Sequence, residues 1–243
     1  MKLVFLGLII FFSYSIQAMT GFGSIVLAIT FGSFFYPIKS ILPILVLLDL
    51  TLNLYIVFKY GKIAKLGLLL KTVLPLIIAG AVVGLSILHS FAVKSKFLLG
   101  LLVTFIAIFE LVNFYRNSEK SPGYIKPGIA NAFLFTAGIV EGMYASGGPL
   151  VVYVLNKLAI GKSVFRSTLA LLWVFMDIFL IAGYLFIHMV GYKSLITAAY
   201  LLPVVVASLI VGEFLHFHVN EKKFRVIVLY ILLIGGLSII LGK

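Results

Sequence analysis

Long apolar runs between short polar breaks constrain this chain more than any other feature of its sequence. Ten runs cover roughly residues 3–19, 22–36, 40–58, 66–88, 95–115, 128–145, 148–160, 164–190, 194–215 and 224–242. A helix needs about 20 apolar residues to cross the hydrocarbon core of a membrane, and most of the runs reach that length. Hydrophobic residues make up 63% of the chain and charged residues 11%, too little charge for a soluble fold of this size. The strict alternation of a transmembrane β-barrel is absent. The sequence therefore predicts an all-α polytopic membrane protein embedded in the lipid bilayer.

Composition and motifs also exclude several classes of function. The net charge is +12, but the 19 basic residues are scattered between apolar runs instead of clustering on one face, so no nucleic-acid partner is expected. With no cysteine, the chain has no disulfide, thiolate metal site or cysteine nucleophile. It carries no nucleotide loop, zinc-protease helix or nucleophile elbow. We expect neither an enzyme nor a bound metal or cofactor.

The order of run lengths repeats in the two halves of the chain. Each half has a long run, a glycine-bearing break, a short run and three full-length runs. Sliding the second half back by 124 residues superposes Gly23 on Gly147, Gln17 on Glu141, and Asn53 on Asp177. We interpret this as an internal duplication. The first repeat, residues 1–120, contains a hairpin at 3–36 and helices at 40–58, 66–88 and 95–115. The second, residues 121–243, contains a hairpin at 128–160 and helices at 164–190, 194–215 and 224–242.

The distribution of positive charge predicts how the chain crosses the membrane. If each glycine-broken pair of runs is a hairpin, 13 basic residues lie on one face and 6 on the other; if each pair crosses once, the division is 10 and 9. Only the hairpin topology gives the bias of the positive-inside rule. It places both termini outside and inverts the second repeat relative to the first. Charge alone leaves open whether the hairpins cross fully or turn back part-way.

The two glycine breaks are the first candidate site. At each break the second arm of a hairpin begins, and its first N–H groups lack helical partners and carry the positive end of the helix dipole. We expect Thr20 or Ser24 to cap the first arm and Ser146 the second. Two such tips, entering from opposite faces, would aim N–H groups at one central volume and bind a small anion. The alternative is that these glycines only allow close helix packing.

Charged residues inside the apolar runs are the second candidate, because they are costly in a membrane. Asp49, Glu141 and Asp177 are candidates to carry a coupling proton, or else make structural hydrogen bonds. Asn53 takes the place of Asp177 in the first repeat and cannot titrate. Arg166 lies about three turns before Asp177 and either neutralises a substrate anion near the cytoplasmic mouth or extends to the interface.

Two other features have simpler interpretations. Gly80 and Gly84 are spaced for close helix packing. His216 and His218 are spaced too poorly for a helical metal pair, and we expect them at the membrane interface.

Two stretches resemble the signatures of the sulfite exporter TauE/SafE family. One is Met19-Thr20-Gly21-Phe22-Gly23-Ser24 with a following Pro37-x-Lys39. The other runs from Gly147-Gly148-Pro149 through Tyr153 to Lys162-x-x-Phe165-Arg166-x-Thr168-Leu169. The resemblance covers nearly the whole chain. Ser24 stands where many members carry Gly or Phe, and a proline common in the first short arm is missing.

The resemblance implies a secondary transporter of the plasma membrane that exports sulfite, sulfoacetate or a related sulfur-containing anion, coupled to protons. The substrate-site residues that it implies are Gly21, Gly23, Ser146, Gly147, Gly148, Arg166 and Thr168. Two other functions stay open: an anion channel with the tips as its filter, and a membrane assembly or scaffold protein without transport.

Overall fold

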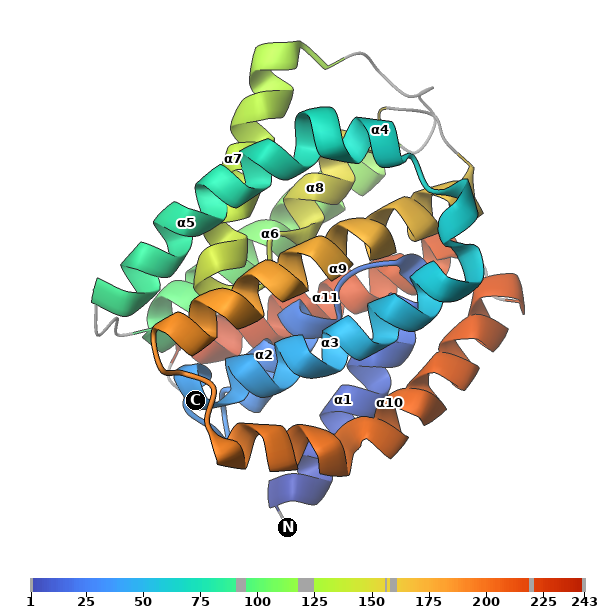
Figure 1. Cartoon of the computed structure of the whole chain (residues 1–243). Helices are drawn as coiled ribbons and strands as arrows, with labels where there is room; N and C mark the ends of the chain where they lie inside the picture. The colour runs from blue at the N-terminus through green and yellow to red at the C-terminus, as the bar shows by residue number, and fades with distance from the viewer. Residues whose placement is uncertain are drawn as a thin grey trace.

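Every secondary-structure element in the described part of the chain is helical (Figure 1). The computed structural model describes residues 2–90, 95–117, 125–155, 157, 161–218 and 221–241. The α-helices are α1 (Lys2–Thr20), α2 (Ser24–Gly32), α3 (Ile38–Tyr60), α4 (Leu66–Leu68), α5 (Leu74–Ser90), α6 (Ser95–Asn117), α7 (Pro127–Tyr144), α8 (Gly148–Leu155), α9 (Lys162–Phe186), α10 (Tyr192–His218) and α11 (Glu221–Ile240). A 3-10 turn (Gly61–Ile63) follows α3, and a π-helical turn (Leu69–Val73) joins α4 to α5. The predicted all-α fold class is confirmed.

Six helical segments of the described chain are long and apolar enough to cross a membrane. They are Lys2–Thr20, Ile38–Ile63, Leu66–His89, Leu99–Arg116, Lys162–Phe186 and Tyr192–His218. Most helices follow the predicted runs closely, but α2 ends at Gly32 instead of residue 36 and α9 at Phe186 instead of residue 190. Helix α8 is described as far as Leu155 of the predicted run 148–160. His188 has a φ of 56°, the left-handed conformation in which many helices end. The protein is therefore a multi-pass membrane protein, whereas its division into two repeats stays a prediction.

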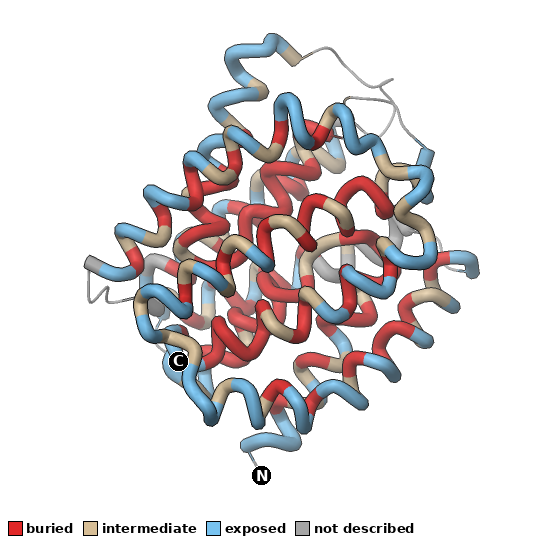
Figure 2. Tube along the Cα trace, in the orientation of Figure 1, coloured by how far each residue is buried: buried red, intermediate tan, exposed pale blue. Residues whose placement is uncertain are grey.

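Four pairs of long helices build the molecule. Helices α3 and α9 lie side by side across its middle, α5 packs against α7, α1 against α10, and α6 against α11 (Figure 1). The buried residues gather along α2, α3, α8 and α9, the centre of the bundle (Figure 2). Polar residues are buried there too, including Asp49, Asn53, Glu141 and Asp177. The centre of the molecule is therefore where a polar site can be shielded from lipid.

The outer helices carry large apolar side chains on their exposed faces. Val4 of α1, Tyr200 and Ile210 of α10 and Ile234 of α11 are among the most exposed of these residues. Soluble monomers rarely expose contiguous apolar surface on this scale, because its contact with water is unfavourable. These faces fit a lipid environment, in agreement with the length of the helices.

Glycines at regular spacing bring α5 and α7 into backbone contact. A Cβ atom on Gly80 would collide with the carbonyl oxygen of Phe135, and one on Gly84 with that of Ile139. On the facing helix, Gly138 would collide in the same way with Ile77. Since small residues allow helices in a membrane to approach closely, the predicted packing role of Gly80 and Gly84 is confirmed. Gly212 does the same for α10, where a Cβ would meet Ala18 of α1.

The second arms of both hairpins are too short to cross the membrane. Helix α2 has 9 residues and α8 has 8, so at about 1.5 Å per residue each is roughly 12–14 Å long. The hydrocarbon core is about 30 Å thick. The described part of each arm is therefore shorter than the hydrocarbon core, and Gly21 and Gly147 at the two breaks are buried in the protein.

Candidate functional site

The two helix breaks have the same backbone geometry, although their sequences differ. Helix α1 ends with Gly21 N–H donating to the carbonyl of Gln17 over 2.7 Å, and α7 ends with Ala145 N–H donating to the carbonyl of Glu141 over 2.7 Å. Both closing residues are left-handed, with φ of 92° at Gly21 and 50° at Ala145. Gly21 suits this conformation because it has no Cβ, whereas Ala145 adopts it at a cost. The two positions are those that the offset of 124 residues superposes.

The side chains that cap the short arms are Gln17 and Glu141. Gln17 Oε1 accepts the N–H of Ser24 at 3.1 Å, and Glu141 Oε2 accepts the N–H of Gly147 at 2.7 Å. The prediction that Thr20, Ser24 or Ser146 would cap these arms is wrong. Gly23 occupies the N-cap position of α2 without a side-chain bond.

The predicted caps use their hydroxyl groups elsewhere. The Thr20 hydroxyl bonds the backbone of its own turn, at the carbonyl of Ile16 over 2.8 Å. The Ser146 hydroxyl donates to the carbonyl of Tyr144 over 2.8 Å. A longer side chain from the preceding helix reaches the bare N–H groups instead, because the tight turn folds that helix back against the start of the next.

The two tips lie against each other in the centre of the protein. A Cβ atom on Gly148, at the second tip, would lie 3.6 Å from Cβ of Phe22 at the first tip. Trp173 of α9 joins them, since its Nε1–H donates to the carbonyl of Gly21 over 2.9 Å and its ring would lie 3.5 Å from the same Cβ on Gly148. Gly147 packs more tightly, because a Cβ there would collide with the carbonyl of Ala137. Gly147 therefore allows close helix packing, which was the alternative to anion binding for the glycine breaks.

A small cavity lies between the tips. It has a volume of about 20 Å³, which is room for about one water molecule. Both hairpin breaks, α3 and α9 contribute to its wall. The lining residues are Gln17, Gly23, Ile25, Val26, Asp49, Glu141, Ala145, Ser146, Gly148 and Trp173. We call it the tip cavity.

A buried polar network connects the first tip to α9. Asp49 Oδ1 lies 2.8 Å from Gln17 Nε2 and 2.6 Å from the Ser24 hydroxyl, and that hydroxyl also lies 2.5 Å from Gln17 Oε1. Asn53 Nδ2 donates to Asp49 Oδ2 over 2.7 Å and to Asp177 Oδ2 over 3.2 Å. Two of the three predicted proton carriers, Asp49 and Asp177, therefore form one network through Asn53, the residue that takes the place of Asp177 in the first repeat. The third, Glu141, lines the tip cavity together with Asp49.

Arg166 and Thr168 lie outside the tip cavity. The Arg166 side chain is 3% exposed and lines a separate cavity with Tyr60 and His216. Its backbone packs on the first tip, where a Cβ added to Gly21 would lie 3.1 Å from the Cα of Arg166. Thr168 Oγ1 donates to the carbonyl of Val164 and accepts the N–H of Lys65, so its hydroxyl holds the loop after α3. The structure thus brings the tip residues together but places these two apart from them.

Sequence reasoning missed three residues of this region. In the sequence, Gln17 was identified only as the residue that superposes on Glu141. That equivalence was the signal that could have shown that both side chains cap the short arms. Trp173 is the single tryptophan of the chain, but its sequence position carries no sign that it bonds Gly21. His216, expected at the interface, is 5% exposed, and its Nδ1 lies 2.7 Å from the carbonyl oxygen of Met19.

Comparison with known proteins agrees with the resemblance seen in the two tip sequences. A family model described as sulfite exporter TauE/SafE matches residues 6–239, nearly the whole chain. No curated protein and no solved structure matches the chain. The matched range includes both helix breaks and the tip cavity, and the chain belongs to the sulfite exporter TauE/SafE family.

Proposed function

We propose that the protein is a secondary transporter that exports a small sulfur-containing oxyanion, such as sulfite or sulfoacetate, across the plasma membrane together with protons. Membership in the TauE/SafE family implies a membrane transporter of sulfite-like anions rather than an enzyme. The observation that carries the finer proposal is the meeting of two broken helices at one central cavity. Broken helices that face each other at mid-membrane form the substrate site of many secondary transporters.

The pairing of helices supports two inverted repeats. If α1, α2, α3, α5 and α6 correspond to α7, α8, α9, α10 and α11, exchanging the repeats turns the α1–α10 contact into the α7–α5 contact. The same exchange maps the α3–α9 and α6–α11 contacts onto themselves. These are the four principal helix contacts of the molecule. Asn53 and Asp177, which are equivalent under this exchange, bond each other at the α3–α9 contact.

The small volume of the tip cavity favours alternating access over an open channel. The cavity has room for about one water molecule, so a sulfite-sized anion cannot occupy it without a change of conformation. Movement of one repeat against the other would open the cavity to each side in turn. In this proposal the N–H groups of Gly23, Ser146 and Gly148 face the anion when the cavity widens.

The carboxyl groups at the cavity support coupling to protons. Asp49 and Glu141 line it, and none of its described lining residues is basic. An ionised carboxylate would repel an anion strongly in so dry a site. We therefore propose that the anion binds together with protons on these acids.

Counting hydrogens around Ser24 assigns one of these protons to Asp49. The Ser24 N–H orients Gln17 so that its Oε1 faces Ser24 and its Nε2 faces Asp49. The Ser24 hydroxyl has one hydrogen but lies within 2.6 Å of two oxygens, Gln17 Oε1 and Asp49 Oδ1. One hydrogen cannot bridge both short contacts, so a second proton is needed. If it lies on Asp49 Oδ1, Asp49 donates to the Ser24 hydroxyl, that hydroxyl donates to Gln17 Oε1, and Gln17 Nε2 donates to Asp49.

Transport by a Gly148→Ala variant tests the proposed site. A Cβ at Gly148 makes only ordinary contacts, 3.5 Å from Trp173 and 3.6 Å from Phe22, so the fold tolerates it while the wall of the cavity thickens. Uptake of labelled sulfite and sulfoacetate into proteoliposomes should fall about tenfold, as expected for an overpacking cost near 1.4 kcal/mol in a filled site. Gly128→Ala is the matched control, because a Cβ there has no atom within 4 Å. Wild-type uptake by Gly148→Ala would contradict the site.

Gly147 is unsuitable for that test. A side chain at Gly147 collides with the backbone of α7 at Ala137, so any larger residue there would disturb the hairpin itself. Loss of transport in a Gly147 variant would report on folding as much as on anion binding.

A further inference from the structure

A second cavity lies beside the first tip, on the other side of its turn. Tyr60, Ser163, Arg166, Ser167 and His216 contribute to its wall. Arg166 is seven residues before Trp173 of the tip cavity, a separation of about 10 Å along α9. The two cavities share none of their described lining residues. We call this second space the Arg166 cavity.

The guanidinium group of Arg166 has an unused pair of donors. Its Nε and Nη2 are buried and have no hydrogen-bond partner among the described residues. These two N–H groups lie on the same edge of the planar group and point the same way, the arrangement that binds two oxygens of one oxyanion. The Cζ of Arg166 lies over the ring of Tyr60, 5.4 Å from the centre of the ring.

The nearest acid does not use these donors. Glu213 of α10 accepts Lys59 Nζ at 2.8 Å and the Tyr60 hydroxyl at 3.2 Å. Lys162 adds further positive charge, with its Nζ 2.7 Å from the carbonyl oxygen of His216. The basic side chains Lys59, Lys162 and Arg166 therefore outnumber the single carboxylate that the described helices bring to this region.

Leaving two buried donors unpaired is unfavourable, because each loses its bonds to water and gains none in return. A bound oxyanion would supply both bonds and a compensating charge at once, but the Arg166 cavity, at about 20 Å³ the same size as the tip cavity, must widen to admit it. The tip cavity has the opposite character, with two acids in its wall. An anion is thus attracted first to Arg166 and reaches the acids only afterwards.

We propose that Arg166 forms a second oxyanion site, in series with the tip cavity, for a ligand with two adjacent oxygens such as a sulfite, sulfonate or carboxylate group. The turn at residues 19–23 separates the two sites. His216 Nδ1 contacts Met19 at one end of this turn, and Trp173 bonds Gly21 in its middle. Ser163 is exposed and lies at the open end of the Arg166 cavity. This inference extends the proposed transport function and rests on it for the order of the two sites.

Equilibrium binding of labelled sulfite and methanesulfonate to the full chain in nanodiscs tests the second site. Wild type should show two classes of site. Arg166→Lys keeps the charge but loses the paired donors, so one class should weaken by roughly tenfold to a hundredfold, the effect of losing one charge-assisted hydrogen bond. Arg116→Lys, at an exposed arginine on α6, is the matched control and should bind as wild type does. A single class of site that Arg166→Lys leaves unchanged would overturn the proposal.

The Gly148→Ala variant separates this proposal from the proposed function. If Arg166→Lys removes one class and Gly148→Ala the other, both sites are supported. If only Arg166→Lys has an effect, the Arg166 site stands and the tip cavity is not a binding site.

Thermal unfolding of Arg166→Gln distinguishes binding from a structural role. We expect this variant to unfold at or above the wild-type temperature without anion, because it no longer buries an unpaired guanidinium, and to lose the part of the sulfite stabilisation that Arg166 provides. A lower unfolding temperature with unchanged sulfite stabilisation would show that Arg166 is structural and that the proposal is wrong.

Discussion

At the scale of single residues, the two tips differ in the side chain that caps them: an amide caps the first tip and a carboxyl group caps the second. Gln17 and Glu141 make the same bond to the arm that follows them, but only Gln17 also donates, through its Nε2, to Asp49 and Asn53. The first tip is therefore capped by an amide, which cannot ionise, in a ring that includes Ser24 and Asp49. The second is capped by a carboxyl group, which can ionise. The two hairpins have similar backbones and different proton chemistry.

Gln17→Glu should destabilise the protein at alkaline pH. The new carboxylate would stand where Gln17 Nε2 now donates to Asp49 over 2.8 Å, so this hydrogen bond is lost and an ionised group is buried without that partner. We expect a loss of about 1–3 kcal/mol in unfolding free energy at pH 8. The loss should shrink as the pH falls, because a protonated carboxyl can donate as the amide did. Thermal unfolding across pH 5–8 measures this, and a pH-independent difference from wild type would contradict it.

Asp49→Asn should remove proton coupling while keeping the fold. The amide of Asn has the shape of the carboxyl group but cannot titrate. We expect the substitution to lose about one hydrogen bond of the ring and to lower the unfolding free energy by about 1 kcal/mol. Sulfite uptake by proteoliposomes should lose its response to an imposed pH gradient. Glu141→Gln, whose amide oxygen can still accept the N–H of Gly147, is the companion variant for the second tip. Full gradient-driven uptake by both variants would show that these acids are structural.

At the scale of elements, close backbone contact positions the hairpins. Helix α7 is pressed against α5 by glycines on both helices, and α1 against α10 by Gly212 and Ala18. In each case the first arm of a hairpin packs on a long helix of the other half of the chain. The breaks at Gly21–Gly23 and Ala145–Gly147 are thereby held at one depth, although each second arm is too short to anchor itself across the membrane.

Gly138→Ala should weaken the α5–α7 contact. Its Cβ would collide with the backbone of Ile77, so the helices must separate, at a cost of about 1–3 kcal/mol or more. Gly128→Ala on the same helix meets no atom within 4 Å and should be neutral or slightly stabilising. Thermal unfolding of the two variants in detergent gives the comparison. Equal unfolding temperatures would contradict the packing role of the glycines.

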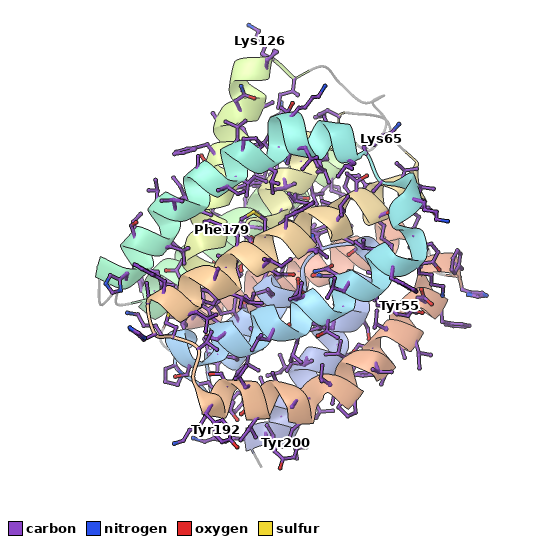
Figure 3. All side chains as sticks on the ribbon, in the orientation of Figure 1. Tyr55, Lys65, Lys126, Phe179, Tyr192 and Tyr200 are labelled. Carbon is purple, nitrogen blue, oxygen red and sulfur yellow. The ribbon has the colours of Figure 1, made fainter. Side chains whose placement is uncertain are left out.

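At the scale of the whole molecule, the chain has two chemically different ends. Lys65 and Lys126 lie at one end, and Tyr192 lies toward the opposite end, near the N-terminus (Figure 3). The basic end also holds Lys162 and the Arg166 cavity. Under the positive-inside rule we expect the basic end to face the cytoplasm, and the proposed export would then bring the anion in from the side of the Arg166 cavity.

Single cysteines test this orientation, and the chain is suited to them because it has none of its own. A membrane-impermeant maleimide should label Tyr192→Cys in intact cells, because this side chain is exposed at the end proposed to lie outside. Lys65→Cys and Lys126→Cys should react only after permeabilisation. The reverse pattern would place the termini in the cytoplasm and turn the proposed export route around.

The helices, their breaks and the family could all be predicted from the sequence. Run length, glycine position and tip motifs are local properties, so the helix ranges and the two glycine turns were predictable before any packing was known. Equivalence of Gln17 with Glu141 was also visible, because it needs only an offset along the chain.

Packing in three dimensions was needed to learn which of these residues act together. It showed that Gln17 and Glu141 cap the short arms, that Asn53 joins Asp49 to Asp177, and that Arg166 lies in a cavity apart from the tips. Most of these facts depend on side chains from segments far apart in the sequence. The distances between these segments depend on helix packing, through contacts such as that of Gly138 with Ile77, and cannot be predicted from local sequence patterns.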